Sequence, residues 1–113
     1  MDVRRGDVVV MAIPSDPGRP RPGIIVQADE LGENTTTVLA CPLSSDVQAN
    51  PNPRLRPVIE PAAGNGLRVR SQIMTDKLFA QRRERVRHVI GSIDSETRGR
   101  LDAALLLVLG LAR

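Results

Sequence analysis

Short runs of β-branched and aliphatic residues, each bounded by glycine, proline or asparagine, fill most of the chain before residue 92. The clearest run is Val8 to Ile13, which is typical of a buried strand and is closed by Pro14. Prolines recur at positions 17, 20 and 22, so we expect Ser15–Arg21 to be a loop. Further strands are predicted at residues 23–27, 35–41, 54–60, 67–74 and 85–91, with Pro42 ending the third strand of the chain.

The strand expected at residues 67–74 alternates in character. Leu67, Val69, Ser71 and Ile73 share one face, whereas Arg68 and Arg70 share the other. This pattern predicts a strand that packs on one side and presents positive charge on the other. The strand expected at residues 54–60 alternates only as far as Pro57, which is typical of an edge strand.

The last segment of the chain has helical periodicity. Asp94 is a suitable N-cap for a helix over about 94–109, and Gly110 is a natural stop. Three further leucines widen the apolar stripe beyond one face, as expected if a second subunit covers the helix. Several short strands and one terminal helix predict a mainly β fold, in which a small antiparallel sheet curls into a partial barrel. The widening leucines are Leu106, Leu107 and Leu109.

Composition narrows the functional classes. The 113 residues suit a single domain spanning 1–113, and 41% of them are hydrophobic. Phe79 is the only aromatic residue, which excludes stacking of several bases as the main binding device. Cys41 and His88 are each the only residue of their type, so neither a disulfide nor a Cys–His metal site is expected. We expect Cys41 to be a core residue and His88 a structural or surface residue.

Targeting and cofactor signals are equally sparse. The apolar stretch from Ala103 to Ala112 is about half the length that a bilayer crossing requires. The glycine fingerprints of nucleotide-binding folds are missing, which leaves nucleotide cofactors without support. We therefore expect a soluble cytoplasmic protein with no cofactor and no membrane association.

Positive charge gathers in the second half of the chain. Fifteen of the sixteen basic residues are arginines, and guanidinium groups bind phosphate and carboxylate oxygens in a two-pronged geometry. A solvated charged face and a polyanion-binding surface both fit the local excess. The excess comprises Arg68, Arg70, Lys77, Arg82, Arg83, Arg85 and Arg87, against Asp76 and Glu84 alone.

Arg21 and Ser44 are the strongest candidates for chemistry. Arg21 lies between two prolines at the start of one predicted strand, so its backbone is stiff, and Ser44 follows the end of the next. If the two strands are neighbours, a guanidinium and a hydroxyl could bind one phosphate. The alternative is a solvated arginine and an ordinary turn serine.

The order and spacing of five segments resemble the MazF/PemK family of toxin endoribonucleases. The resemblance spans nearly the whole chain, ends with the predicted helix, and includes the R-P and P-[IVLC]-T-[ST] signatures that carry Arg21 and Ser44. The segments are Arg5–Val9, Arg21–Val26, Val38–Ser45, Gly66–Lys77, and Val89–Asp94 followed by Leu109–Leu111.

The resemblance implies a small SH3-like antiparallel barrel of the CcdB/PemK type that acts as a homodimer. It implies metal-independent cleavage of single-stranded RNA to a 2′,3′-cyclic phosphate and a 5′-hydroxyl, and inhibition by a cognate antitoxin with an acidic, partly disordered segment. Arg21 and Ser44 would be catalytic, with Ser44 standing where the family usually has threonine. The residues expected to bind RNA are Arg19, Ser45, Arg68, Arg70 and Lys77.

Two departures from the family pattern bear on the mechanism. The loop before Arg21 lacks the family's glutamate, and Phe79–Arg82 stands where one branch has an R-T/S-I/V-D acid–base segment. Two other functions stay open. A non-catalytic toxin resembling the CcdB gyrase poisons would use the terminal helix around Ala104–Arg113, and a regulatory barrel would only bind an antitoxin.

Overall fold

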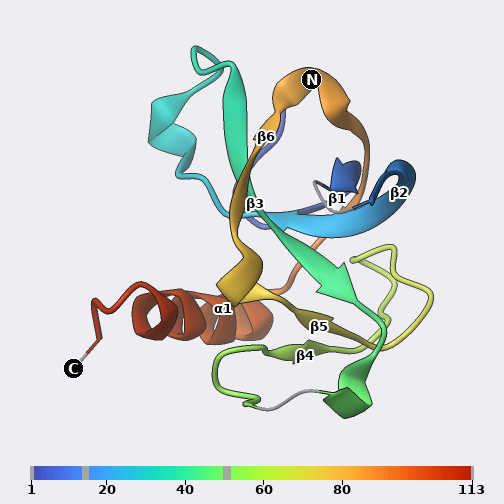
Figure 1. Ribbon diagram of the computed structural model, residues 1–113, viewed down its shortest axis with the longest axis vertical. Helices are drawn as coiled ribbons and strands as arrows, with labels where there is room; N and C mark the ends of the chain where they lie inside the picture. Colours follow the sequence, from blue (N-terminus) through green and yellow to red (C-terminus); the bar gives the residue numbers. More distant parts are fainter. Residues whose placement is uncertain (1, 14–15, 50–51, 113) are drawn as a thin grey trace.

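A curled antiparallel sheet and one C-terminal helix form the computed structural model, which describes residues 2–13, 16–49 and 52–112 (Figure 1). In this part of the chain the strand order is β4-β5-β3-β2-β1-β7, and β6 pairs with β3 off that path. The mainly β fold with a terminal helix is therefore confirmed. The elements are β1 (Asp7–Ile13), β2 (Asp16–Ile25), β3 (Thr37–Ser44), β4 (Val58–Ile59), β5 (Ser71–Ile73), β6 (Phe79–Arg82), β7 (Val86–Ser92) and α1 (Ser95–Val108), with short 3-10 turns η1 (Asp29–Leu31), η2 (Val47–Ala49), η3 (Thr75–Lys77) and η4 (Arg83–Arg85).

Strand β3 joins the two halves of the sheet. Its first half pairs with β6, its middle residues pair with β2 and its last residues pair with β5, so it crosses the middle of the molecule (Figure 1). The prediction that Pro42 ends this strand is wrong. Pro42 lies opposite Gly23 of β2, and the next residue, Leu43, already pairs with Ile73 of β5. The proline, which has no N–H to donate, thus occupies the position where the strand changes partners.

The loop predicted at residues 15–21 is also wrong from Asp16 onward, while Ser15 lies outside the described residues. β2 begins at Asp16 and pairs with β1 as far as Ile24. Its pairing with β3 covers only Gly23 to Ile25. Among the described strands, the first part of β2 has a hydrogen-bonded neighbour on one side only, so no N–H is needed on its other side to bond a neighbouring strand. Prolines are tolerated there, whereas in an interior strand each would remove a hydrogen bond of the sheet.

Three other strand predictions need correction. The strand expected at 54–60 is limited to Val58–Ile59, and the one expected at 67–74 to Ser71–Ile73. The expected contrast between a buried and an exposed face is absent there, because all three residues of β5 are buried while Val69 is exposed before the strand. β6, at Phe79–Arg82, was not predicted, since its short polar sequence becomes a strand only through pairing with β3.

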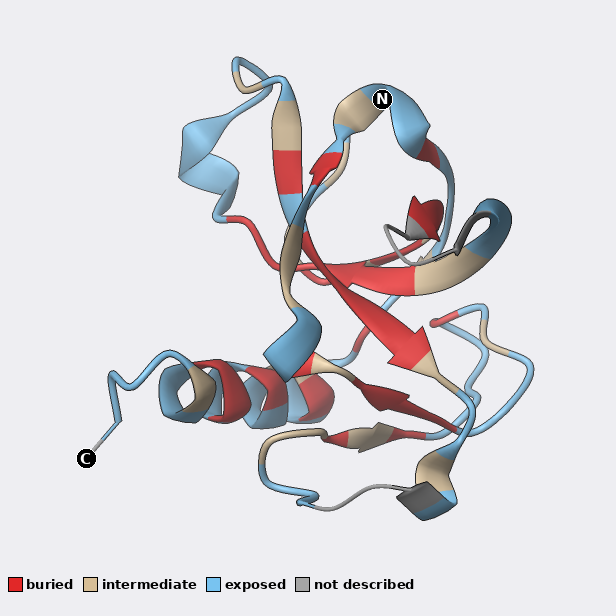
Figure 2. Cartoon of the chain, viewed as in Figure 1, coloured by how far each residue is buried: buried red, intermediate tan, exposed pale blue. Residues whose placement is uncertain are grey.

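The sheet has a hydrophobic cluster on each face. The first cluster contains Ile24, Cys41 and Ile73 and is covered by Leu101 and Leu105 of α1, whose buried side faces the sheet (Figure 2). The second contains Met11, Ile25, Val38, Ala40 and Val86 and fills the opposite, concave side. Successive strand residues alternate between these clusters, as the two-residue period of a strand requires.

Helix α1 begins as predicted. The Thr97 N–H donates to the Asp94 side chain at 2.8 Å, and this bond lowers the pKa of the Asp94 carboxyl. The helix ends beside Gly110, whose φ is +75°. Within the described residues, no helix is long and apolar enough to cross a membrane.

Cys41 is a core residue, as predicted, with none of its surface exposed. Burial raises the pKa of its thiol to about 12, so the reactive thiolate is scarce at neutral pH. We expect a thiol reagent to label Cys41 no faster than the protein unfolds, and to label it at once in denaturant. Rapid labelling of the native protein at pH 8, followed by mass spectrometry, would contradict this.

Candidate functional site

Arg21 and Ser44 belong to neighbouring strands that share one register. Gly23 lies opposite Pro42 and Ile25 lies opposite Ala40, and this register, continued two residues past its last pair, would set Arg21 across from Ser44. Residues opposite each other in a sheet present their side chains on the same face. Both residues are half-buried. The condition on which the pairing of these two side chains depended, that β2 and β3 are neighbours, is thus met.

The face that carries them is opposite the helix. Leu43 and Ile73 pair with each other and belong to the helix-covered cluster, so their neighbours Ser44 and Gln72, which also pair, lie on the other side. Gly23 lies between Arg21 and Ile25, and the Met11 side chain packs against it. A Cβ at position 23 would come within 2.1 Å of the Met11 Cε, so glycine leaves room for Met11 on this face. The site therefore lies where the concave face meets β5.

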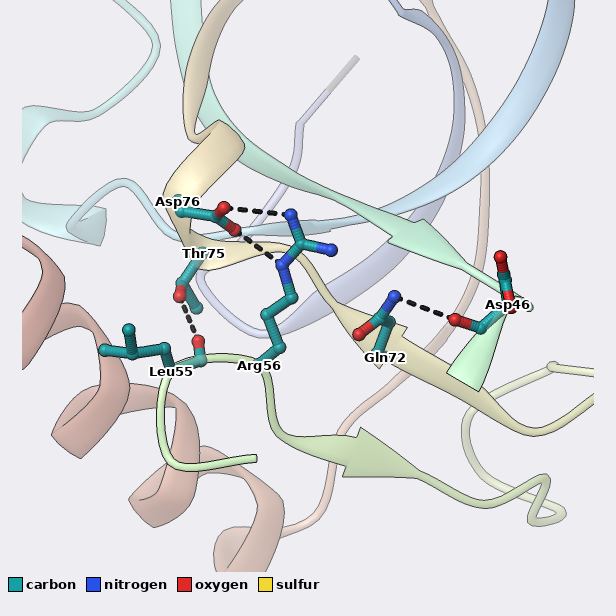
Figure 3. Close-up of polar contacts among 6 residues, drawn as sticks. All are labelled: Asp46, Leu55, Arg56, Gln72, Thr75 and Asp76. Atoms are coloured by element: carbon teal, nitrogen blue, oxygen red, sulfur yellow. Dashed lines mark hydrogen bonds and ion pairs between the residues drawn. The ribbon is translucent and has the colours of Figure 1, made fainter. Parts of the chain in front are cut away.

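Gln72 joins this site from β5, although the sequence analysis assigned it no role. Its side chain is buried, and its Nε2 donates to the main-chain oxygen of Asp46 at 3.0 Å (Figure 3). The N–H of Asp46 in turn donates to the Ser44 Oγ at 3.1 Å. A buried amide therefore holds the residue that contacts the candidate catalytic hydroxyl.

A second pair of contacts holds the segment before β4 against η3. Arg56 donates through Nε and Nη2 to the two carboxylate oxygens of Asp76, each at 2.8 Å, and the Thr75 hydroxyl donates to the Leu55 carbonyl (Figure 3). The hydrogen bond from Arg56 lowers the pKa of Asp76, and the same bond raises the pKa of Arg56. This bidentate pair borders the site on the side of β4.

Asp76→Asn is expected to reduce the free energy of unfolding at pH 7 by about 0.5–1 kcal/mol, since the carboxylate is partly exposed and screened. Because the folded-state pKa of Asp76 is lowered, its stabilisation is present above its ordinary value of 3.8 and is lost as the pH falls below it. Urea unfolding at pH 7 and pH 3 measures this. An equal difference between the two proteins at both pH values would contradict the ion pair's contribution.

The five residues expected to bind RNA are all exposed but do not form one tight cluster. Arg19 lies on β2, two residues before Arg21, and Ser45 directly follows β3. Lys77 lies on η3, next to Asp76. Arg68 and Arg70 precede β5 rather than forming part of it, and Arg70 pairs with Glu60 at 2.9 Å.

Part of the basic stretch serves the fold. Arg83 donates to the carbonyls of Gly32 and Thr35, and Arg82 pairs with Glu84 at 3.2 Å. Arg85 and Arg87 are exposed and line an open hollow of about 540 Å³ beside Ala12 and Glu84. The positive field expected from the sequence is therefore narrower than the count of arginines suggests.

His88 is an exposed residue of β7. Among the described residues, no group of three or more histidine, cysteine, aspartate or glutamate side chains could hold a metal ion. The sequence analysis did not single out Gln72 or Arg56, whose side-chain contacts lie beside the candidate site. A signal for Gln72 exists in hindsight: it is a polar residue between two that the alternating pattern assigned to the core.

The chain is similar to known proteins over almost its whole length. Residues 4–109 match the family described as PemK-like, MazF-like toxin of type II toxin–antitoxin systems. A protein of Mycolicibacterium smegmatis named probable endoribonuclease MazF is 34% identical over 111 residues, which covers 97% of this chain and 99% of the relative.

Solved structures agree on the fold. A mycobacterial endoribonuclease in complex with its cognate antitoxin superposes with a TM-score of 0.79 at 18% identity, covering 98% of both chains. The Mycobacterium tuberculosis toxin MazF-mt6 gives 0.78 at 17% identity over 95% of this chain and 99% of that one, and MazF of Deinococcus radiodurans gives 0.77 at 19% over 97% and 98%. The curled sheet with its terminal helix, and the sequence match over almost every residue, lead to one conclusion: this chain belongs to the PemK-like, MazF-like toxins of type II toxin–antitoxin systems.

Proposed function

We propose that this toxin is an endoribonuclease that cleaves single-stranded RNA without a metal ion, using the face that bears Arg21 and Ser44. The observation that supports the proposal is the pairing of β2 with β3, the neighbouring strands that carry Arg21 and Ser44, both of which are half-buried. The curated relative's name, probable endoribonuclease MazF, supports the same activity.

Arg21 and Ser44 suit this reaction as stabilisers of negative charge. Neither a guanidinium nor an alcohol readily gains or loses a proton near neutral pH, so solvent water would take and supply the protons. The 2′-oxygen of one ribose attacks the adjacent phosphorus, the bond from phosphorus to the 5′-oxygen breaks, and the products are a 2′,3′-cyclic phosphate and a 5′-hydroxyl. One proton leaves the 2′-hydroxyl and one joins the 5′-oxygen, so no water is consumed. Negative charge grows on the phosphoryl oxygens in the transition state, where Arg21 and the Ser44 hydroxyl stabilise it more than in the ground state.

The RNA on either side of the cut would lie over exposed cationic and polar groups. Arg19 lies on β2 and Ser45 directly follows β3, the two strands that carry the proposed catalytic pair. Lys77 lies on η3, which follows β5 and its Gln72 in the chain. Arg68 and Arg70 precede β5 and would contact RNA farther away. Because these contacts are to phosphates, binding should weaken as salt rises.

Two kinds of protein partner are proposed for this chain, an antitoxin and a second copy of the chain. Structures of a mycobacterial endoribonuclease with its cognate antitoxin and of MazE-MazF from Deinococcus radiodurans support an antitoxin partner, for which we propose an acidic, partly disordered segment. We also propose a homodimer in the cytoplasm, where RNA is available. The exposed leucines at the end of α1 support a second subunit: Leu106, Leu107, Leu109 and Leu111 are 47%, 38%, 55% and 68% exposed.

The gyrase-poison alternative is not favoured, because the family that matches residues 4–109 is that of the PemK-like, MazF-like toxins. The two functions still predict different results. A nuclease requires Arg21 and Ser44, whereas a gyrase poison would depend on the end of α1.

The test is to incubate the purified protein with total bacterial RNA in EDTA and to map the new ends. We expect 5′-hydroxyl ends at a short recurring sequence, matched by 2′,3′-cyclic phosphates, and far fewer such ends with Ser44→Ala. Growth arrest on expression of the chain without new RNA ends would overturn the proposal in favour of a non-nucleolytic toxin.

A further inference from the structure

Gln72 is a buried amide in β5 that is only half satisfied. Its side chain is 2% exposed and its Nε2 donates to the Asp46 carbonyl, but no donor within the described residues reaches its Oε1. An acceptor buried without a donor costs about 1–3 kcal/mol, a cost that an apolar residue of the same shape would avoid. The fold alone therefore gives little reason for glutamine here.

Another buried glutamine shows the contrast. Gln27, two residues after the end of β2, donates to the Thr35 hydroxyl at 3.1 Å and accepts from the Leu39 N–H at 3.2 Å. Both ends of that amide are used, and each ties together parts of the fold. Gln72 uses only its donor, and that donor reaches the residue next to the candidate site.

The bond from Gln72 acts on Ser44 through Asp46. Gln72 holds the Asp46 carbonyl at 3.0 Å, and the N–H of the same residue donates to the Ser44 Oγ at 3.1 Å. Gln72 and Ser44 are also direct neighbours across the β3–β5 ladder. With Asp46 held in place, the Ser44 oxygen accepts a main-chain N–H, which leaves the hydroxyl proton to be donated elsewhere.

We infer that Gln72 is a positioning residue, which holds Asp46 so that the Ser44 hydroxyl donates to the phosphoryl oxygen of the RNA rather than turning away. This rests on the proposed endoribonuclease function. A hydroxyl that accepts one hydrogen bond becomes a better donor in the next, so the contact both orients and polarises Ser44. Figure 3 shows the geometry of the Gln72 and Asp46 contact at the end of β3.

The test measures kcat and KM on a short single-stranded RNA that contains the mapped cleavage site. Gln72→Met removes the bond to Asp46 and also the unsatisfied acceptor. We expect kcat to fall about ten- to a hundredfold with KM within about twofold of the wild type, and Tm to stay the same or rise. Gln27→Met is the matched control, with a lower Tm and an unchanged kcat.

Two further variants separate positioning from packing. In Ser44→Ala, adding Gln72→Met should cause no further loss, because the hydroxyl that Gln72 positions is gone. Gln72→Glu restores the donor only when its carboxyl is protonated, so the ratio of its kcat to that of the wild type should rise as the pH is lowered from 8 to 5. If Gln72→Met proves unstable, this ratio decides the question on a folded protein.

The outcomes distinguish the inference from the function on which it rests. If the wild type does not cleave, or if Ser44→Ala cleaves like the wild type, the proposed function fails. If Ser44→Ala is impaired but Gln72→Met keeps the wild-type kcat, changes KM or the cleaved sequence alone, or adds its full loss to Ser44→Ala, the positioning role fails and the nuclease stands. A pH-independent ratio for Gln72→Glu would also overturn it.

Discussion

Arg21→Ala is expected to slow RNA cleavage by about a hundred- to a thousandfold, the usual loss when one preorganised donor to a developing negative charge is removed. Arg21 lies on β2 and Ser44 on the neighbouring strand β3, and we propose that the guanidinium and the hydroxyl bind the same phosphate. The effect should appear in the rate of the chemical step, because the charge that Arg21 stabilises is greatest in the transition state.

Single-turnover cleavage with excess protein isolates that step. Arg21→Lys should be intermediate, because it keeps the charge but loses the two-pronged contact. Arg4→Ala is the matched control, since it removes one exposed positive charge outside the proposed site. Equal losses in Arg21→Ala and Arg4→Ala would mean that Arg21 contributes only net charge, and the assignment of the site would fail.

Gly66→Ala is expected to lower the free energy of unfolding by about 2–5 kcal/mol, from about 1–2 for a left-handed backbone and about 1–3 for overpacking. Gly66 has a φ of +71°, and a Cβ there would lie 2.2 Å from the carbonyl oxygen of Ile90 in β7. The obstruction is main chain, which cannot rotate aside as a long side chain can. The turn that precedes β5 would have to move away from β7.

The matched control is Gly64→Ala, in the same turn. Its φ is not positive, and no atom lies within 4 Å of a Cβ built there. Thermal unfolding followed by circular dichroism should show a drop of more than about 10 °C for Gly66→Ala, and a change of a few degrees at most for Gly64→Ala. Similar shifts for the two variants would show that the close approach of the turn to β7 does not constrain the fold.

The sequence predicts an element correctly where the residues that determine it lie within a few positions of one another. The unbroken run before Pro14 became β1, and Asp94 caps the helix because its carboxylate needs only the N–H of Thr97, three residues ahead. Cys41 was assigned to the core from its apolar neighbours. Arg21 and Ser44 were proposed as a pair on the condition that the consecutive strands carrying them are neighbours and on the resemblance to the MazF/PemK family, and β2 does pair with β3.

The errors have a common cause, which is pairing between distant segments. Pro42 looked like a strand end, but β3 continues because β5 takes over from β2 as its partner at that residue. β6 forms a strand only because it pairs with the first half of β3. Thr37 and Arg82, which lie opposite each other in this pair, are more than forty residues apart in the sequence. No period or propensity in residues 79–82 encodes such a partner.

The amino-acid pattern by itself determined the class of fold, the helix with its cap, the core thiol, and the arginine and serine at which we propose that RNA is cleaved. Tertiary structure alone decided how that serine is held. The contact from Gln72 to Asp46 spans 26 residues and that from Arg56 to Asp76 spans 20, so both depend on where the sheet brings its strands together. Hydrogen bonds between side chains are effective over about 3 Å, and only the folded chain sets which polar groups come within that distance.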